Sequence, residues 1–366
     1  MFRTKSCRFP RPAFSLIELL VVIAVIALLI SILLPGLCFS RAAGRKGVCQ
    51  SNLKQFGVGI QGYATDFHDR LVSVTWRKQV RYVDWTTPNP APNVTKACAD
   101  QAIDIIRRRT GRTDIQTPVN WIPFPLYNHL VMNDYLAQKL PEPMVVCPED
   151  RLRILWQRSI QPDPLAFHAL AADQLRPGTA GVNNDDKRWP FSSTYQFVAC
   201  FWSPDNDKNM TSAAPLRTVN QVNLAHNFYN VPAPTDGTTL GDRRMTEVEF
   251  PSNKVAMFDQ HARHPSCNNK NQLFHLYDEA TVPLLFFDTS VRDVKTANSN
   301  KGFDPRFPTN HTAVTNTTYT PSGWEQTFAP IKAGVPAARP ARYRFTRAGL
   351  RGVDVTGTEI RVLNPN

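Results

Sequence analysis

The run from Phe14 to Leu34, FSLIELLVVIAVIALLISILL, constrains this chain more than any other feature. All of its residues are apolar or small, with the single exception of Glu18. As a helix rising about 1.5 Å per residue, the run would extend roughly 31 Å, which matches a bilayer hydrocarbon core of about 30 Å. Because lipid offers the backbone no hydrogen-bond partners, a lone span must be helical. The run therefore predicts one transmembrane helix over residues 14–34.

The residues before this run are basic. They include four cationic side chains and no acidic one, namely Arg3, Lys5, Arg8 and Arg11. Such a flank favours a cytoplasmic N-terminus, which would place everything after Leu34 on the far side of the membrane.

Glu18 lies near one end of the span, four residues after Phe14. A carboxylate at the centre of a membrane helix costs about 2.5 to 3.5 kcal/mol, and such residues usually have a partner. Glu18 could reach back to the lipid headgroups. Alternatively, if the chain were cut between Ala13 and Phe14, the new amino group of a neighbouring copy would lie at the same depth and offset the charge.

The N-terminal sequence RPAFSLIELLVVIAVIALLISILLPGL resembles type IV prepilins and type II secretion pseudopilins. The resemblance implies that a prepilin peptidase removes residues 1–13 by cutting between Ala13 and Phe14, and then methylates the amine of Phe14. It also implies an assembly role for Glu18 and a helix-kinking role for Pro35. The family usually has Gly before the cut, where this chain has the equally small Ala13.

The same resemblance sets expectations for location, partners and cofactors. It implies a single-pass inner-membrane protein with a periplasmic head, whose partners are other pilin or pseudopilin subunits in a homo- or hetero-oligomeric fibre. It implies no enzymatic activity and no cofactor. Calcium is the alternative, because some major pseudopilins bind it in a late loop, and Asp288 and Asp293 are the positions to test.

Two other interpretations of the N-terminus are less favoured. A secretory signal peptide has a shorter apolar core, followed by a small-residue cleavage site that Ser40-Arg41-Ala42 could imitate. The run here is too long for that class and contains an acid. A lipoprotein modified at Cys38 would need a small residue where Leu37 stands.

Beyond Pro35 the helix is expected to continue to residue 68. A stripe of apolar residues recurs there at steps of three and four, which predicts that one face packs on the head: Cys49, Leu53, Phe56, Ile60, Tyr63 and Phe67. The segment from Gly57 to Gly62 fits G-x-G-x-x-G, but it lies inside a helix rather than after a strand. Its glycines therefore predict close packing rather than nucleotide binding.

The segment CQSNLKQFGVGIQGYATDF is similar to the C-x-N-N-L-K-Q-I-G segment of a large bacterial pilin-like family. Shorter pieces follow in that family's order: 121–135, 146–148, 192–202, 251–259 and 283–296. The family often has Asp-Gly where this chain has Asp288 and Thr289.

The head is expected to be α+β, with the long N-terminal helix packed on a mostly antiparallel sheet. Helices are predicted at 97–109 and 125–138, and strands at 194–202, 254–258, 284–288 and 291–295, the last two joined by a hairpin turn at 288–290. A further hairpin is expected within 343–363. The predicted organisation is a leader (1–13), a transmembrane helix (14–34), its continuation (35–68), a periplasmic head (69–296) and an extended C-terminal segment (297–366).

The seven cysteines show no Cys-x-x-Cys pair, which argues against a zinc site. Five of them would lie in an oxidising compartment that permits disulfides: Cys49, Cys98, Cys147, Cys200 and Cys267. Five is an odd number, so at least one should stay free or pair between chains. The sequence does not specify the pairing.

Candidate chemistry in the head is sparse. Asp259, His261 and His264 are the nearest approach to a metal site, but Arg263 separates the histidines, so a surface loop is the default expectation. The stretch starting at Asp205 fails as a calcium loop because the required Gly is Met210. We find no hydrolase, metalloprotease or phosphate-binding motif.

The formal net charge is +12, and leader removal would lower it to about +8. Four arginines cluster at a predicted helix end, where the helix dipole favours cations: Arg107, Arg108, Arg109 and Arg112. The cluster lacks the interleaved aromatics of single-strand binders, so nucleic acid is a less favoured partner.

The sequence as a whole predicts a pilin-like structural subunit that assembles through its N-terminal helix into a secretion pseudopilus or pilus-like fibre. The alternatives are a membrane-tethered envelope enzyme or ligand-binding protein, and a DNA-binding minor pilin.

Overall fold

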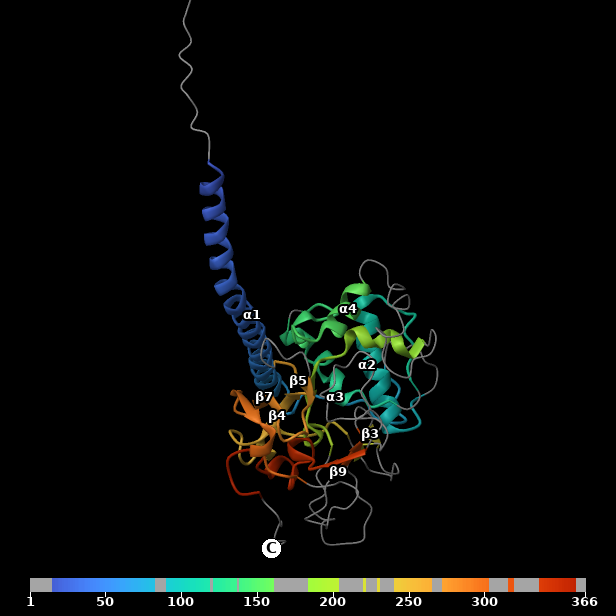
Figure 1. Ribbon diagram of the computed structural model, residues 1–366. Coiled ribbons are helices and arrows are strands. Elements are labelled where there is room, and N and C mark those ends of the chain that lie inside the picture. Colours follow the sequence, from blue (N-terminus) through green and yellow to red (C-terminus); the bar gives the residue numbers. More distant parts are fainter. Residues whose placement is uncertain are drawn as a thin grey trace, which may run out of the picture. The chain divides into compact units, whose positions relative to one another are not determined.

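The computed structural model combines one long helix with short helices and antiparallel strands, so the fold is α+β (Figure 1). The chain divides into two compact units, Met1–Gly44 and Arg45–Asn366, and the second is called the head below. The structure describes residues 15–82, 90–118, 121–136, 138–160, 184–203, 220–221, 229–230, 240–264, 272–302, 315–318 and 336–359.

Helix α1 runs without interruption from Leu16 to Asp66 and is drawn in blue in Figure 1. Pro35 lies inside it, as the predicted continuation beyond the apolar run requires. From residue 15 to residue 37 every side chain is exposed. This first part of α1 therefore buries none of its apolar side chains within the chain.

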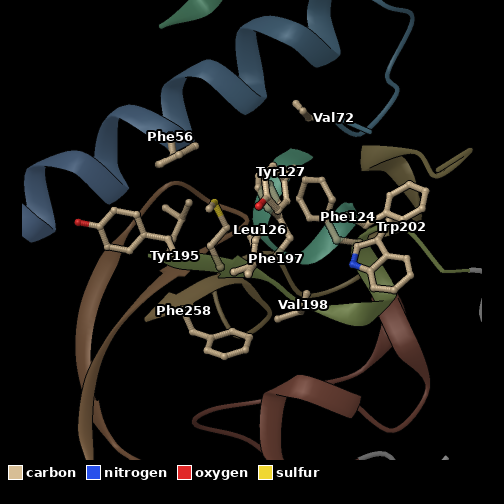
Figure 2. Close-up of a cluster of buried hydrophobic side chains, with 14 of the residues drawn as sticks. Phe56, Val72, Phe124, Leu126, Tyr127, Tyr195, Phe197, Val198, Trp202 and Phe258 are labelled. Atoms are coloured by element: carbon tan, nitrogen blue, oxygen red, sulfur yellow. The ribbon is translucent and has the colours of Figure 1, made fainter. Parts of the chain in front are cut away.

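The part of α1 that belongs to the head is amphipathic, as predicted. Its stripe of apolar side chains is buried at Cys49, Leu53, Phe56, Ile60 and Tyr63. The ring of Phe56 contacts Tyr195 and Phe197 edge-on, with centroids 6.0 and 6.3 Å apart (Figure 2). The prediction fails only at Phe67, which lies beyond the last helical turn and is exposed.

The main sheet has four antiparallel strands in the order β1 (Tyr195–Phe197), β4 (Val255–Asp259), β7 (Thr281–Phe286) and β8 (Val291–Lys295). The predicted hairpin between β7 and β8 is confirmed, although β7 both begins and ends earlier than the predicted strand at 284–288. In its turn, Thr289 has a φ of 66°, the left-handed region where the pilin-like family often has Gly.

Helix α1 is tied to this hairpin by polar contacts. Lys54 Nζ donates to the carbonyl oxygen of Thr289 at 3.0 Å, and Gln61 Nε2 donates to that of Phe287 at 3.0 Å. Gly57 lies so close that an added Cβ would be 3.0 Å from a methyl group of Leu285. The expectation that these glycines serve close packing is thus confirmed.

The remaining strands form two-stranded antiparallel ladders. They are β2 (Asn220–Gln221) with β3 (Tyr229–Asn230), β5 (His261–Ala262) with β6 (Leu273–Phe274), and β9 (Thr315–Thr318) with β10 (Pro336–Arg339).

The head contains three further α-helices among its described residues: α2 (Val94–Thr110), α3 (Phe124–Tyr127) and α4 (Arg151–Ser159). Helix α2 matches the predicted helix. It begins at the Asn93 cap, whose side chain accepts from the Lys96 amide, and ends at Gly111 with a φ of 71°.

The predicted helix over 125–138 is wrong. Only α3 is α-helical there, followed by 3₁₀ turns at Asn128–Leu130 and Asn133–Tyr135. The buried side chain of Asn128 donates to the carbonyl oxygen of Val72 at 3.2 Å, so a tertiary contact holds this turn. Helix propensity is weak enough for such contacts to override it.

The strand predicted over 194–202 is too long. After Val198 donates to the carbonyl of Ala256, the chain turns into a 3₁₀ helix at Ala199–Phe201. That turn lets Trp202 stack on Phe124 with centroids 4.7 Å apart (Figure 2). Burial of two large rings thus ends the strand early.

The described C-terminal residues pack into the head. Where a hairpin was expected, residues 340–359 form 3₁₀ helices at Arg342–Phe345 and Gly349–Arg351. Asp354 accepts from Lys254 Nζ at 2.7 Å and from the Val255 amide at 2.9 Å. Burial opposes the charge on Lys254, but the Asp354 carboxylate outweighs it and raises the lysine pKa.

Candidate functional site

The surface of α1 from Leu16 to Leu34, called the anchor segment below, is the largest exposed apolar feature of the described chain. Its side chains point outward on all sides of the helix, from Leu16 at 81 % exposure to Leu34 at 60 %. A helix that is apolar all round requires lipid or other helices as neighbours. By length and composition, α1 is able to cross a membrane.

Glu18 occupies the first turn of α1, where it forms a capping box with Ser15. Its Oε2 accepts from the Ser15 amide at 2.9 Å, while Ser15 Oγ accepts from the Glu18 amide at 3.2 Å. This reciprocal pair satisfies two amides at the helix start. The predicted cleavage and methylation positions, Ala13 and Phe14, lie outside the described residues, and so does the leader.

Of the two carboxylates considered for calcium, Asp288 lies in the turn before β8 and Asp293 in the middle of β8, and both bind protein groups. Asp288 Oδ1 accepts from the amide and the hydroxyl of Ser290, at 2.9 and 2.6 Å. Asp293 Oδ2 pairs with Lys46 at 2.7 Å and accepts from Gln50 at 3.0 Å. The structure therefore gives each a local role in the turn or against α1, and calcium binding stays a prediction.

The arginine cluster at the end of α2 is paired within the head. Arg107 donates to the carbonyl oxygen of Ile115, Arg108 pairs with Asp104 and Arg109 with Asp134. Arg112 pairs with Asp114 at 2.8 Å. These contacts give the cluster a structural account.

The segment from Asp259 to His264 is not the expected surface loop. Asp259, His261 and Arg263 are buried, and His264 is half-buried. Arg263 bridges two buried carboxylates, with Nε 3.0 Å from Asp259 Oδ1 and Nη2 3.3 Å from Asp150 Oδ2. The segment follows β4 into the core, which periodicity alone did not reveal.

The pKa values of the two carboxylates that contact Arg263 shift in opposite directions. Burial would raise the pKa of Asp150, but the charges of Arg263 and Arg153 outweigh it and lower the pKa to about 2. At Asp259 burial dominates and raises the pKa to about 6, despite Arg263. Asp150 is therefore the carboxylate that carries the charge opposite the arginines.

Beside this network, three side chains from distant segments converge. Cys49 from α1, Cys147 from the loop before α4 and His264 from the end of β5 have ligand atoms within 4.8 Å of one another. Cys147 Sγ lies 3.3 Å from His264 Nε2. We call these three residues the thiol–imidazole cluster.

Neighbouring groups position the cluster. The hydroxyl of Tyr195 donates to Cys49 Sγ at 3.1 Å. The amide of Cys147 donates to Thr194 Oγ1 at 3.2 Å, and that hydroxyl donates to Asp150 Oδ2 at 2.8 Å. The buried ionic network thus supports the segment that carries Cys147.

Burial also determines the protonation of the cluster. It raises the pKa of the Cys147 thiol well above its usual value, with the Cys49 sulfur adding to the effect. It lowers the pKa of His264 to about 4, assisted by the charge of Arg263. A neutral Cys147 thiol and a neutral His264 imidazole therefore face one another near neutral pH.

Sequence reasoning missed this cluster because it relied on short Cys spacings. Cys147 and His264 are 117 residues apart, and only the fold joins them. Four cysteines expected to be able to form disulfides are buried thiols outside any disulfide: Cys49, Cys98, Cys147 and Cys200. Cys38 is disulfide-bonded. Cys267 and the stretch at Asp205 lie outside the described residues.

The fold and the anchor segment together define a class: an α+β protein whose one long apolar helix among the described residues fits a single-pass membrane anchor. The family model of the prokaryotic N-terminal methylation motif matches residues 11–34, which supports a type IV pilin-like or pseudopilin family. The motif points to a structural subunit processed by a prepilin peptidase. Neither the curated proteins nor the solved structures gave a significant match.

Proposed function

We propose that this chain is a pilin-like subunit that assembles through its anchor segment into a pseudopilus or pilus-like fibre for secretion. In this proposal, a prepilin peptidase cuts between Ala13 and Phe14 and methylates the new amine. The observation that carries the proposal is an apolar helix surface exposed on every side. Its one acid lies four residues after the proposed cut.

The anchor segment would have two successive neighbours. Before assembly, lipid surrounds it in the inner membrane, and the basic leader holds the N-terminus on the cytoplasmic side, so that the head is periplasmic. After extraction, the anchor segments of other subunits replace the lipid and form the fibre core. The same apolar surface suits both states because neither contact requires directional bonds.

Glu18 would then have two roles. Within one chain it caps α1 through Oε2, as the contact with Ser15 supports. Among the described atoms no contact occupies its second carboxylate oxygen, which would face the methylated amine of Phe14 in a neighbouring subunit. That pairing offsets a charge that lipid or an apolar fibre core solvates poorly.

Pro35 would provide a point of adjustment in the helix. It has no amide hydrogen, so the carbonyl of Ser31 loses its usual helical donor there. We expect α1 to bend or locally unwind at this position when subunits pack side by side.

Mass spectrometry of the mature N-terminus tests the processing step. The proposal requires a chain that begins with N-methyl-Phe14. A chain beginning at Met1 or near Ala43 would contradict it, because the anchor segment would then be unprocessed or lost.

A second experiment separates the two roles of Glu18. In cells of the native host, the yield of sheared fibres is compared for Glu18→Gln and Ser15→Ala. Glu18→Gln keeps an oxygen for the cap and loses the charge, whereas Ser15→Ala weakens the cap and keeps the charge. We expect fibre yield to fall at least tenfold only for Glu18→Gln. Equal yields from both variants would refute the pairing between subunits.

A further inference from the structure

The thiol–imidazole cluster is the feature of the head that the assembly proposal leaves unused. We propose that Cys49, Cys147 and His264 bind one soft transition-metal cation, with Zn²⁺ as its principal occupant. The inference is independent of how the chain assembles, because all three residues belong to the head.

The chemistry of the three groups matches such an ion. Two thiolates with one imidazole form a ligand set that suits zinc and copper(I). It does not suit calcium or magnesium, which take oxygen ligands. Zinc bond lengths of about 2.3 Å to sulfur and 2.0 Å to nitrogen imply tetrahedral S–N separations of about 3.5 Å. The observed separation between Cys147 Sγ and His264 Nε2 is 3.3 Å, close to that value, and all three ligand atoms lie within 4.8 Å of one another.

The charge balance also fits. Zn²⁺ with two thiolates is neutral overall, and a neutral complex can be buried without a charged partner. Binding would release the two thiol protons, because zinc is bound by thiolates.

The surrounding residues already form hydrogen bonds that position the two cysteines. The hydroxyl of Tyr195 already donates to Cys49 Sγ, a bond that strengthens once the sulfur is a thiolate. Thr194 and Asp150 fix the backbone beside Cys147. His264 is half-buried, so it is the ligand through which an ion would reach the two buried sulfurs.

Three protein ligands leave a fourth tetrahedral position for water or an added ligand. The three segments joined are α1, the loop before α4 and the end of β5. A bound ion would therefore fasten the buried half of α1 to two other parts of the head, and it would stabilise the fold by mass action.

A disulfide between Cys49 and Cys147 is the rival arrangement. Both thiols are free in the structure, and a disulfide would give the imidazole at Cys147 no role. The two arrangements exclude each other because a disulfide removes both thiolates.

The test uses the full chain, purified in detergent from cells grown with zinc and analysed for metal content by mass spectrometry. We expect about one zinc per chain. Cys147→Ser and His264→Gln should each lower that content at least tenfold, whereas Cys98→Ser, which removes a buried free thiol outside the cluster, should leave it unchanged. Full metal content in Cys147→Ser would overturn the proposal.

Cobalt(II) serves as a spectroscopic probe of the same site. Added to the metal-free protein, it should give a thiolate-to-cobalt charge-transfer band in the parent and in Cys98→Ser, but not in Cys147→Ser. His264→Gln replaces a half-buried side chain, so it disturbs the core less than a cysteine substitution does. Zinc should raise the melting temperature of the parent and not that of this variant. Non-reducing peptide mapping that finds Cys49 joined to Cys147 in metal-free purified protein would overturn the proposal.

Discussion

The two halves of α1 share one backbone and differ in what surrounds them. From residue 15 to 37 every side chain is exposed, and the apolar ones cover the whole helix. From Cys49 to Ala64 the apolar side chains other than Val58 form one stripe, which is buried in the head. The comparison teaches that the distribution of apolar residues around a helix, rather than their number, decides what the helix packs against. A single stripe packs on the same chain, whereas an apolar surface on all sides requires lipid or other helices.

The glycines of α1 show the same contrast. An added Cβ would meet nothing within 4 Å at Gly36, Gly44 or Gly47. At Gly57 and Gly59 it would meet side chains of the head. Glycine at the packed positions permits close approach, whereas at the open positions it only weakens the helix.

The strongest test of this contrast removes one large apolar side chain from each half. Phe56 is fully buried, so Phe56→Ala should lower the free energy of unfolding of the head by about 3 to 5 kcal/mol. Ile26 is 48 % exposed, so Ile26→Ala should leave it unchanged. Denaturant unfolding followed by tryptophan fluorescence measures both. Similar losses would mean that the anchor segment also packs on the head.

The second test introduces a charge into each half. Ile26→Arg should oppose membrane insertion by about 2.5 to 3.5 kcal/mol, because arginine is poorly solvated by lipid. Val58 is 60 % exposed on the same helix, so Val58→Arg serves as the matched control and should insert normally. The membrane-retained fraction after alkaline extraction measures the effect. Full retention of Ile26→Arg would argue against the span.

The third test uses acid, since the anchor segment contains no histidine and the head buries His129. Burial lowers the pKa of His129 to about 3. Between pH 6.5 and about 3 the unfolded chain therefore binds more protons than the folded one, so stability falls as the pH falls through this window. The slope from this group is at most about 1.4 kcal/mol per pH unit.

His129→Gln isolates that contribution, because the other titrating groups are common to both proteins. Unfolding free energies at pH 6.5 and pH 4 should decline more steeply for the parent than for the variant. Parallel declines would show that the imidazole titrates normally in the folded head.

These tests concern features with different degrees of predictability. The anchor segment, the stripe around Phe56, helix α2 and the β7–β8 hairpin could be predicted because each is encoded in neighbouring residues. The helix expected after Pro125 was wrong because a tertiary bond from Asn128 holds the chain in 3₁₀ turns. Local patterns contain no information on such a contact.

The sites divide in the same way. The methylation motif at residues 11–34 is contiguous, so sequence alone was sufficient to find it. The thiol–imidazole cluster draws on three segments with no characteristic spacing, and it exists only once β5 and the loop before α4 meet α1. Five cysteines suggested disulfides, whereas four of them are buried thiols outside any disulfide.

The smallest expected effect comes from two glycines of one helix. Gly47→Ala should raise the free energy of unfolding by about 0.4 to 1 kcal/mol, because alanine favours the helix and the added methyl meets nothing. Gly57→Ala should lower it by about 1 to 3 kcal/mol, because its Cβ would lie 3.1 Å from that of Thr289, in a turn with little freedom to move. Paired denaturant titrations measure the difference in sign. If both substitutions stabilised the head, the packing of α1 on the hairpin would be looser than the structure shows, and the contrast between open and packed positions of α1 would weaken.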